Sequence, residues 1–137
     1  MSVQVLRQEI AYGPDGERRS WVGDLSRVTC SDFRQLEPEW RSLAAEDACR
    51  EPFYQPEFFL AFAKAFCEGR TLRLLSVRRD GALRGILPLV QANSVFHGLP
   101  ARALRSMSGI HSCRCDLVHA VRDRRETTLA AWHVLRA

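Results

Sequence analysis

The densest group of chemically capable side chains lies in residues 111–119. It contains His111, Cys113, Cys115, Asp116 and His119. In an extended strand the first three would share one face, because successive side chains alternate. Imidazole and thiolate are zinc ligands, but structural zinc sites usually combine two closely spaced cysteine pairs. No second pair follows here, so the spacing does not predict a metal site. The other cysteines stand singly: Cys30, Cys49 and Cys67.

Asp116 is the strongest single candidate for a binding role. It follows a mixed polar segment and precedes Leu117 and Val118, a pattern that suits the edge of a strand facing a cleft. A carboxylate there can orient an amine or a hydroxyl group, and it can act as a base where burial raises its pKa. A helix cap or a surface ion pair with Arg114 is the alternative. His111 and Arg114 are weaker candidates for the same substrate site, and no residue is assigned as catalytic.

The composition indicates one globular domain with ordinary surface charge. The chain has 137 residues, is 46% hydrophobic and carries a formal charge of +4. Lys64 is the only lysine among 20 basic residues, and 16 acidic residues accompany them. No stretch approaches the ~20 apolar residues of a membrane span. The first residues lack the pattern of a secretory signal, and five cysteines are an odd number, so we expect reduced thiols and a cytoplasmic protein.

The elements that would position Asp116 begin after a flexible leader, which we expect over residues 1–20. A first strand is expected over residues 21–30. A short turn capped by Ser31 or Asp32 then follows, and Pro38 would lie in the first turn of the helix proper. Its apolar residues fall at helical spacings on one face, with Trp40 as the main core anchor. They are Phe33, Leu36, Trp40, Leu43 and Ala44.

A second helix is expected from Pro56 to Gly69, and a hairpin follows it over residues 71–89. Asp80 and Gly81 separate two apolar runs, which is a strong signal for a tight hairpin turn. Pro88 cannot donate to a strand ladder, so it should lie at a strand end, an edge or a bulge.

The later part of the chain predicts a loop over residues 93–100 and strands over 101–108 and 110–118. A last helix, capped by Asp123, would follow. The sequence contains neither a Gly-rich phosphate-binding loop nor a Ser nucleophile elbow. The mixture of helices and strands predicts an α/β or α+β fold. One face of the last helix would carry Thr128, Leu129, Trp132 and Leu135.

Four segments, taken in order, carry a resemblance to a known family. Residues 39–43 (Glu-Trp-Arg-Ser-Leu) match an early helix, and residues 52–59 (Pro-Phe-Tyr-Gln-Pro-Glu-Phe-Phe) match a loop leading into a second helix. Residues 74–89 match a hairpin that closes on Leu-Pro-Leu, and residues 115–118 (Cys-Asp-Leu-Val) match a later segment beside the substrate cleft. Over residues 21–135 the chain resembles the N-terminal lobe of GNAT-superfamily acyltransferases of the CelD-like, cellulose-biosynthesis-associated type. These are related in architecture to the FemABX transferases.

The resemblance implies a GNAT-like mixed sheet with flanking helices over residues 21–137. It also implies a truncated two-lobed protein, whose second lobe would hold most of the acyl-CoA site. The activity implied is transfer of an acetyl or other acyl group from acetyl-CoA or another acyl-CoA to a small-molecule amine. Catalysis would come from positioning and from polarising the thioester carbonyl. Asp116 would orient the acceptor with His111 and Arg114 nearby, and the lobe alone would be inactive.

The alternative is a non-catalytic, Arg-rich interaction module that binds an acidic partner or nucleic acid. Its basis is the group of arginines on and beside the hairpin. Nucleic acid is the less favoured partner, because the aromatic residues are expected to be buried. Association with a membrane is not expected, and exposed apolar surface on an isolated lobe predicts self-association. The arginines are Arg70, Arg73, Arg78, Arg79 and Arg84.

Overall fold

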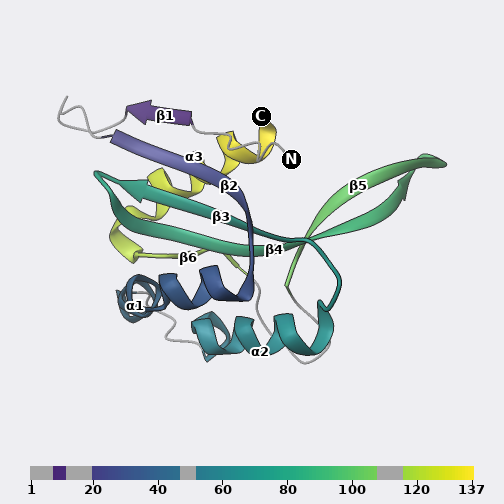
Figure 1. Cartoon of the computed structure of the whole chain (residues 1–137). Helices are drawn as coiled ribbons and strands as arrows, with labels where there is room; N and C mark the ends of the chain where they lie inside the picture. Colours follow the sequence, from purple (N-terminus) through teal and green to yellow (C-terminus); the bar gives the residue numbers. More distant parts are fainter. Residues whose placement is uncertain (1–7, 12–19, 47–51, 108–115) are drawn as a thin grey trace.

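The described part of the chain folds into one antiparallel sheet with helices on both faces (Figure 1). The computed structural model describes residues 8–11, 20–46, 52–107 and 116–137. The strands are β1 (Gln8–Ala11), β2 (Ser20–Val28), β3 (Leu72–Arg79), β4 (Ala82–Phe96), β5 (Leu99–Ser106) and β6 (Val118–His119). The helices are α1 (Cys30–Glu46), η1 (Pro52–Tyr54), α2 (Pro56–Phe66), η2 (Val121–Asp123) and α3 (Arg124–Arg136). The predicted α+β fold class is confirmed.

All strand pairs of the sheet are antiparallel, in the order β1-β2-β3-β4-β5, and β6 pairs separately with β4. Strand β1 falls within residues 1–20, which were expected to form a flexible leader. Residues 1–7 and 12–19 of that segment lie outside the described part. The four residues Gln8–Ala11 show no polar–apolar alternation that would predict a strand, and their pairing with β2 depends on the rest of the sheet.

The β3–β4 hairpin turns at Asp80 and Gly81, as predicted. Both residues have positive φ angles, 49° and 84°, which matches the turn whose twist suits two antiparallel strands. The Asp80 carboxylate accepts a hydrogen bond from the Ser20 N–H at 3.1 Å, and the Asp80 N–H donates to the Ser20 carbonyl at 2.9 Å. The turn is therefore joined to the start of β2 as well as closing its own hairpin.

Two hydrophobic cores cover the two faces of the hairpin, as its paired apolar residues predicted. Leu74 and Ile86 pack toward α1 and α2, whereas Leu75 and Val77 pack toward α3. Figure 1 shows α1 and α2 below the sheet and α3 above it. A strand between two covered faces must be apolar at consecutive positions, which explains the pairs in the sequence.

Helix α3 lies close to the sheet because two glycines leave room for it. A Cβ atom at Gly23 would meet the Val134 side chain at 2.3 Å, and one at Gly85 would meet the Thr127 side chain at the same distance. The side chains facing the sheet are Thr127, Ala130, Ala131 and Val134. The predicted face with Leu129, Trp132 and Leu135 instead points outward, with Trp132 57% exposed.

Helix α1 begins with a reciprocal cap. The Asp32 carboxylate accepts from the Thr29 N–H at 2.6 Å and from the Thr29 hydroxyl at 2.8 Å, and the Asp32 N–H donates back at 3.4 Å. Thr29, rather than Ser31, is thus the capping residue. Pro38 lies inside the helix and not in its first turn, so the prediction for Pro38 was wrong. The loss of one backbone bond is offset by the buried face on which Trp40 lies.

Strand β4 extends beyond β3 and forms, with β5, an arm that stands away from the body (Figure 1). The predicted loop over residues 93–100 is wrong, since only His97 and Gly98 form the turn between the strands. Both residues have positive φ angles, 50° and 80°. The apolar residues at the tip are exposed: Val95 by 71%, Phe96 by 69% and Leu99 by 69%.

Among the described residues, no helix is long and apolar enough to cross a membrane.

Trp40 joins α1 to the segment that carries Tyr54. It is fully buried, and its Nε1 donates to the Tyr54 carbonyl at 2.8 Å. We predict that Trp40→Phe lowers the free energy of unfolding by about 1–3 kcal/mol, because a buried carbonyl loses its donor. Trp132→Phe, at an exposed site on α3, should change it by less than about 0.5 kcal/mol. Urea unfolding followed by circular dichroism measures both. Equal effects of the two substitutions would contradict a stabilising role for the hydrogen bond between Trp40 and the Tyr54 carbonyl.

A buried ion-pair network closes the end of the sheet near the hairpin turn. The Arg84 Nε donates to Asp123 Oδ2 at 2.6 Å, and Arg79 Nη1 donates to Asp123 Oδ1 at 2.7 Å. Arg84 and Asp123 are 6% and 5% exposed. Asp123 makes no side-chain cap bond to α3, so the predicted capping role was wrong. Its carboxylate is used instead to neutralise two arginines of the hairpin.

We predict that Asp123→Asn destabilises the protein by about 3–5 kcal/mol, because it removes the buried partner of the Arg84 guanidinium and leaves only the exposed Glu46 carboxylate, at 3.2 Å, as a counter-charge. Glu46→Gln is the matched control. Glu46 also accepts from Arg84, at 3.2 Å, but its side chain is 41% exposed, so a cost below about 1 kcal/mol is expected. Denaturant unfolding measures the two costs. A cost below 1 kcal/mol for Asp123→Asn would show that Arg84 does not depend on this partner.

Candidate functional site

The candidate site lies where β4 changes its neighbour at Pro88. On one side β4 pairs with β3 as far as Val90, but on the other side β5 pairs from Leu89 onward and β6 pairs with Gly85 and Ile86. Pro88 is therefore at a local edge, in agreement with its predicted position. We refer to this part of β4, between the end of β5 and the start of β6, as the fork.

The hydrogen-bond pattern explains why a proline is tolerated there. The Gln91 N–H donates to the Thr71 carbonyl at 2.9 Å, toward the β3 side. Because bonded pairs alternate in an antiparallel ladder, Leu89 and Leu87 also face β3, and Pro88 faces the fork. The N–H group that proline lacks would thus point to the place where the described strands β5 and β6 leave β4 unpaired.

The fork determines where Asp116 lies. Strand β6 places Val118 opposite Ile86 and His119 opposite Gly85. If this register continued by two residues, Asp116 would stand opposite Pro88. The strand instead begins at Val118. Because Pro88 offers no N–H, the reciprocal pair of bonds with Asp116 cannot form, and the side chain of Asp116 is exposed beside the ladder.

Tyr54, in the short helix η1, contacts the Asp116 side chain. The Tyr54 hydroxyl donates to Asp116 Oδ2 at 3.2 Å. Tyr54 is 4% exposed and belongs to η1, whose position is set by the hydrogen bond from Trp40. A buried phenol thus holds one oxygen of an exposed carboxylate. A carboxylate held in this way can accept hydrogen bonds from an ammonium or amine group at its exposed side.

The other predicted site residues are only partly within the described structure. His111, Cys113, Arg114 and Cys115 lie outside the described residues. His119 is described, and its Nδ1 lies 3.3 Å from the Ala120 carbonyl oxygen, in β6 beyond the fork. Among the described residues, no group of three or more His, Cys, Asp or Glu side chains could hold a metal ion.

Cys30 and Cys67 are free thiols. Burial is the main cause that raises the pKa of the Cys67 thiol above its usual value. Less of the nucleophilic thiolate is then present at neutral pH. Cys67 is accordingly best interpreted as a small apolar side chain of the core beside α2.

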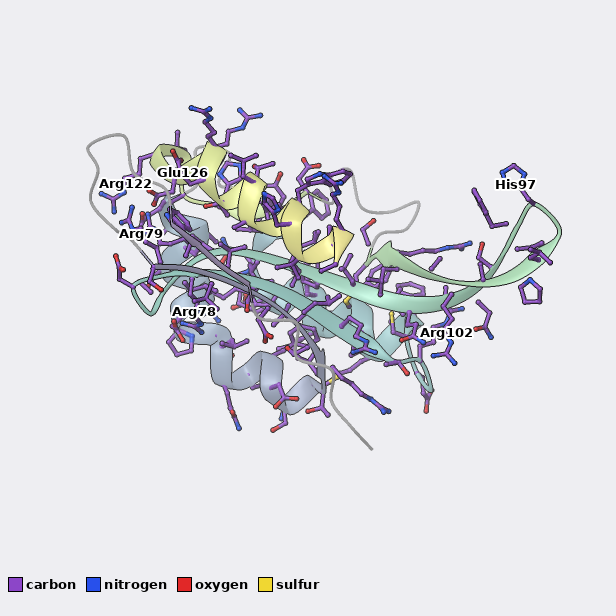
Figure 2. All side chains as sticks on the ribbon, turned by 90° about the horizontal axis from the view of Figure 1, so that it is seen from above. Arg78, Arg79, His97, Arg102, Arg122 and Glu126 are labelled. Atoms are coloured by element: carbon purple, nitrogen blue, oxygen red, sulfur yellow. The ribbon has the colours of Figure 1, made fainter. Side chains whose placement is uncertain are left out.

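The hairpin arginines divide into two groups. Arg78 donates to Glu39, at 2.7 and 3.2 Å, while Arg79 and Arg84 contact Asp123. These three are neutralised at the turn end of the hairpin, where Figure 2 shows Arg78 and Arg79. Arg70 and Arg73 lie at the opposite end, near the arm.

Asp116 stays a predicted site residue, and the sequence did not indicate its hydrogen-bond partner Tyr54. Tyr54 was visible only as part of an aromatic loop before Pro56, and nothing in the spacing joined it to a residue 62 positions later. Pro88 was the sequence feature that could have indicated the position of the site. A proline in an apolar strand marks a place where one side of the strand has no ladder, and the register of β6 then points to Asp116.

The Arg78–Glu39 pair gives a pH-dependent prediction. The hydrogen bond from Arg78 is the main cause that lowers the pKa of the Glu39 carboxyl below its usual value. A lowered folded-state pKa stabilises the fold above the usual pKa, and this stabilisation is lost as the pH falls through the lowered pKa. Arg78→Gln should return the Glu39 pKa toward its usual value, as followed by carboxyl NMR shifts. Arg34→Gln, an exposed change on the same helix, should leave it unchanged. An unshifted Glu39 pKa in the unmodified protein would contradict the pair.

Comparisons with protein families, with curated proteins and with solved structures found no match to this chain.

Proposed function

We propose that this chain is the N-terminal part of an acyl-CoA-dependent N-acyltransferase, in which Asp116 orients a small-molecule amine. The observation that supports the proposal most is the Tyr54–Asp116 contact at the fork. It provides an exposed carboxylate of fixed position beside an interrupted strand ladder. An amine held by Asp116 would be presented to the acyl group of acetyl-CoA or of another acyl-CoA.

The order of elements is consistent with this proposal. A helix with Trp40, a loop with Tyr54, a second helix, a hairpin and a later Asp-Leu segment occur in the order on which the resemblance to GNAT-type acyltransferases rests. The chemistry asked of the site is mainly positioning. Holding the amine near the thioester lowers the entropic cost of the reaction, and no covalent intermediate on the protein is needed.

The described residues at the fork fit the acceptor better than the donor. They offer a carboxylate and a phenol, which suit an amine, but no arginine that could bind the phosphates of acyl-CoA is described there. Asp116 and Tyr54 would hold the amine, while the acyl-CoA would be bound mainly by a further lobe. The acyl-CoA supplies the activated carbonyl when it is bound.

The alternative, an Arg-rich interaction module, receives less support from the hairpin. Arg78, Arg79 and Arg84 are engaged with Glu39 and Asp123. These three guanidinium groups are partly or fully buried, so a partner would have to compete with ion pairs of the fold. The arginines at the other end of the hairpin are treated below.

A cytoplasmic location and self-association belong to the same proposal. Free Cys30 and Cys67 suit a reducing compartment. The exposed apolar tip of the arm, with Phe96 at 69% exposure, is the kind of surface that associates with another molecule.

The experiment is acyl transfer by the full product of the gene, from acetyl-CoA to a panel of small amines, measured as release of the CoA thiol. Asp116→Asn should lower kcat/KM for the amine by about a hundredfold or more, because a neutral amide orients an ammonium group poorly. Tyr54→Phe, which removes only the hydroxyl, should have a smaller effect in the same direction.

Asp80→Asn is the matched control, because it makes the same chemical change in a hairpin turn where asparagine is well tolerated. It should leave kcat/KM unchanged. Transfer to none of the amines, or equal rates for Asp116→Asn and the unmodified protein, would overturn the proposal. Calorimetry with acetyl-CoA separates loss of donor binding from loss of acceptor orientation.

A further inference from the structure

A hollow of about 440 Å³ lies where β3 begins, between the loop before it and the base of the arm. Arg70 and Thr71 of the loop form one wall, Gln91 and Asn93 of β4 form the second, and Arg105 of β5 contributes from the third strand. None of these residues belongs to the fork. We name this hollow the arginine hollow.

The arginine hollow contains cations and neutral hydrogen-bonding groups but no acidic side chain among its lining residues. Both Arg70 and Arg105 are exposed, and within the described part of the chain neither has a hydrogen bond or ion pair from its side chain. This differs from the turn end of the hairpin, where the arginines have carboxylate partners. The structure therefore leaves two guanidinium groups from different elements available to one ligand.

The walls of the arginine hollow are joined by hydrogen bonds. The Gln91 N–H donates to the Thr71 carbonyl at 2.9 Å, which fixes the loop against β4. Arg73 Nη2 donates to Gln91 Oε1 at 3.4 Å. The register places Arg105 opposite Val90 and Leu104 opposite Gln91. The side chain of Arg105 therefore shares a face of the sheet with Val90 and not with Gln91.

A second hollow, of about 490 Å³, continues from the same loop and shares Arg70 and Thr71 with the first. It adds Arg27 and Lys64, together with one acid, Glu68. The basic surface thus extends on both sides of Arg70. Each volume falls in the range of small-molecule sites, which is about 300–1,000 Å³.

From this arrangement we propose that the arginine hollow binds a small molecule carrying at least two phosphate groups. Arginine provides a planar fork of donors that matches phosphate oxygens, and two forks on different walls can bind two phosphates at once. The proposal rests on this hollow alone, so it stands or fails separately from the proposed acyl transfer.

The test is calorimetric titration of the full chain with pyrophosphate, with inorganic phosphate and citrate as comparison ligands. We expect pyrophosphate to bind more tightly than either of them. Arg70→Gln combined with Arg105→Gln should weaken pyrophosphate binding by about tenfold or more, because two charge-assisted contacts are lost. Arg102→Gln combined with Arg125→Gln removes the same charge from exposed positions outside the hollow, and it should change the affinity less than about twofold.

Figure 2 shows Arg102 near the base of the arm, so the control pair includes a close neighbour of the arginine hollow. Circular dichroism and the melting temperature check that both double variants are folded. Absence of pyrophosphate binding at millimolar concentration would overturn the proposal, as would tighter binding of citrate, or equal losses in the two double variants. A single-stranded oligonucleotide is titrated as the last ligand. It would identify a nucleic-acid surface instead if it bound more tightly than pyrophosphate, if its affinity fell steeply with salt, and if both double variants weakened it equally.

Discussion

The missing N–H of Pro88 is the constraint on which the arrangement of the sheet depends. Among the described residues, the 15-residue strand β4 has three partner strands. β3 pairs with it on one side as far as Val90, and Pro88 faces the other side, where the partner changes from β6 to β5. The proline thus separates the arm from the body of the sheet. It also ends the β6 ladder before Asp116, and this leaves a carboxylate at the fork with Tyr54 as its partner.

The two faces of the sheet are packed in different ways. On one face, α1 and α2 bring large side chains, and the fully buried Trp40 links them to Tyr54. On the other face, α3 approaches so closely that only glycine fits beneath it at Gly23 and Gly85. The same difference explains the charge distribution, because η2, just before α3, places Asp123 against the hairpin arginines. Among the described residues, no element places a carboxylate against Arg70 or Arg73 at the other end of the hairpin in this way.

Much of the fold could be predicted because the patterns were local. The Asp80–Gly81 turn, the two apolar faces of the hairpin and the apolar face of α1 each depend on neighbouring residues. The errors concern relations that are distant in sequence. Trp132 and its neighbours looked like a core face, but the close approach of α3 to Gly23 selects the small side chains instead. The arm was mistaken for a loop, because the polar and apolar residues at 93–100 do not alternate with the period of a strand. For the candidate site, the sequence singles out Asp116, whereas its contact with Tyr54 could be seen only in the folded chain.

The central claim is that Pro88 ends the β6 ladder and leaves Asp116 outside it. The most direct measurement is hydrogen exchange of the backbone amides by NMR under native conditions. The account predicts slow exchange for Ile86 and Val118, which pair with each other, and fast exchange for Asp116, two residues away. Exchange of the Asp116 amide as slow as that of Val118 would show that the ladder continues past Pro88, and it would contradict the fork as the basis of the site.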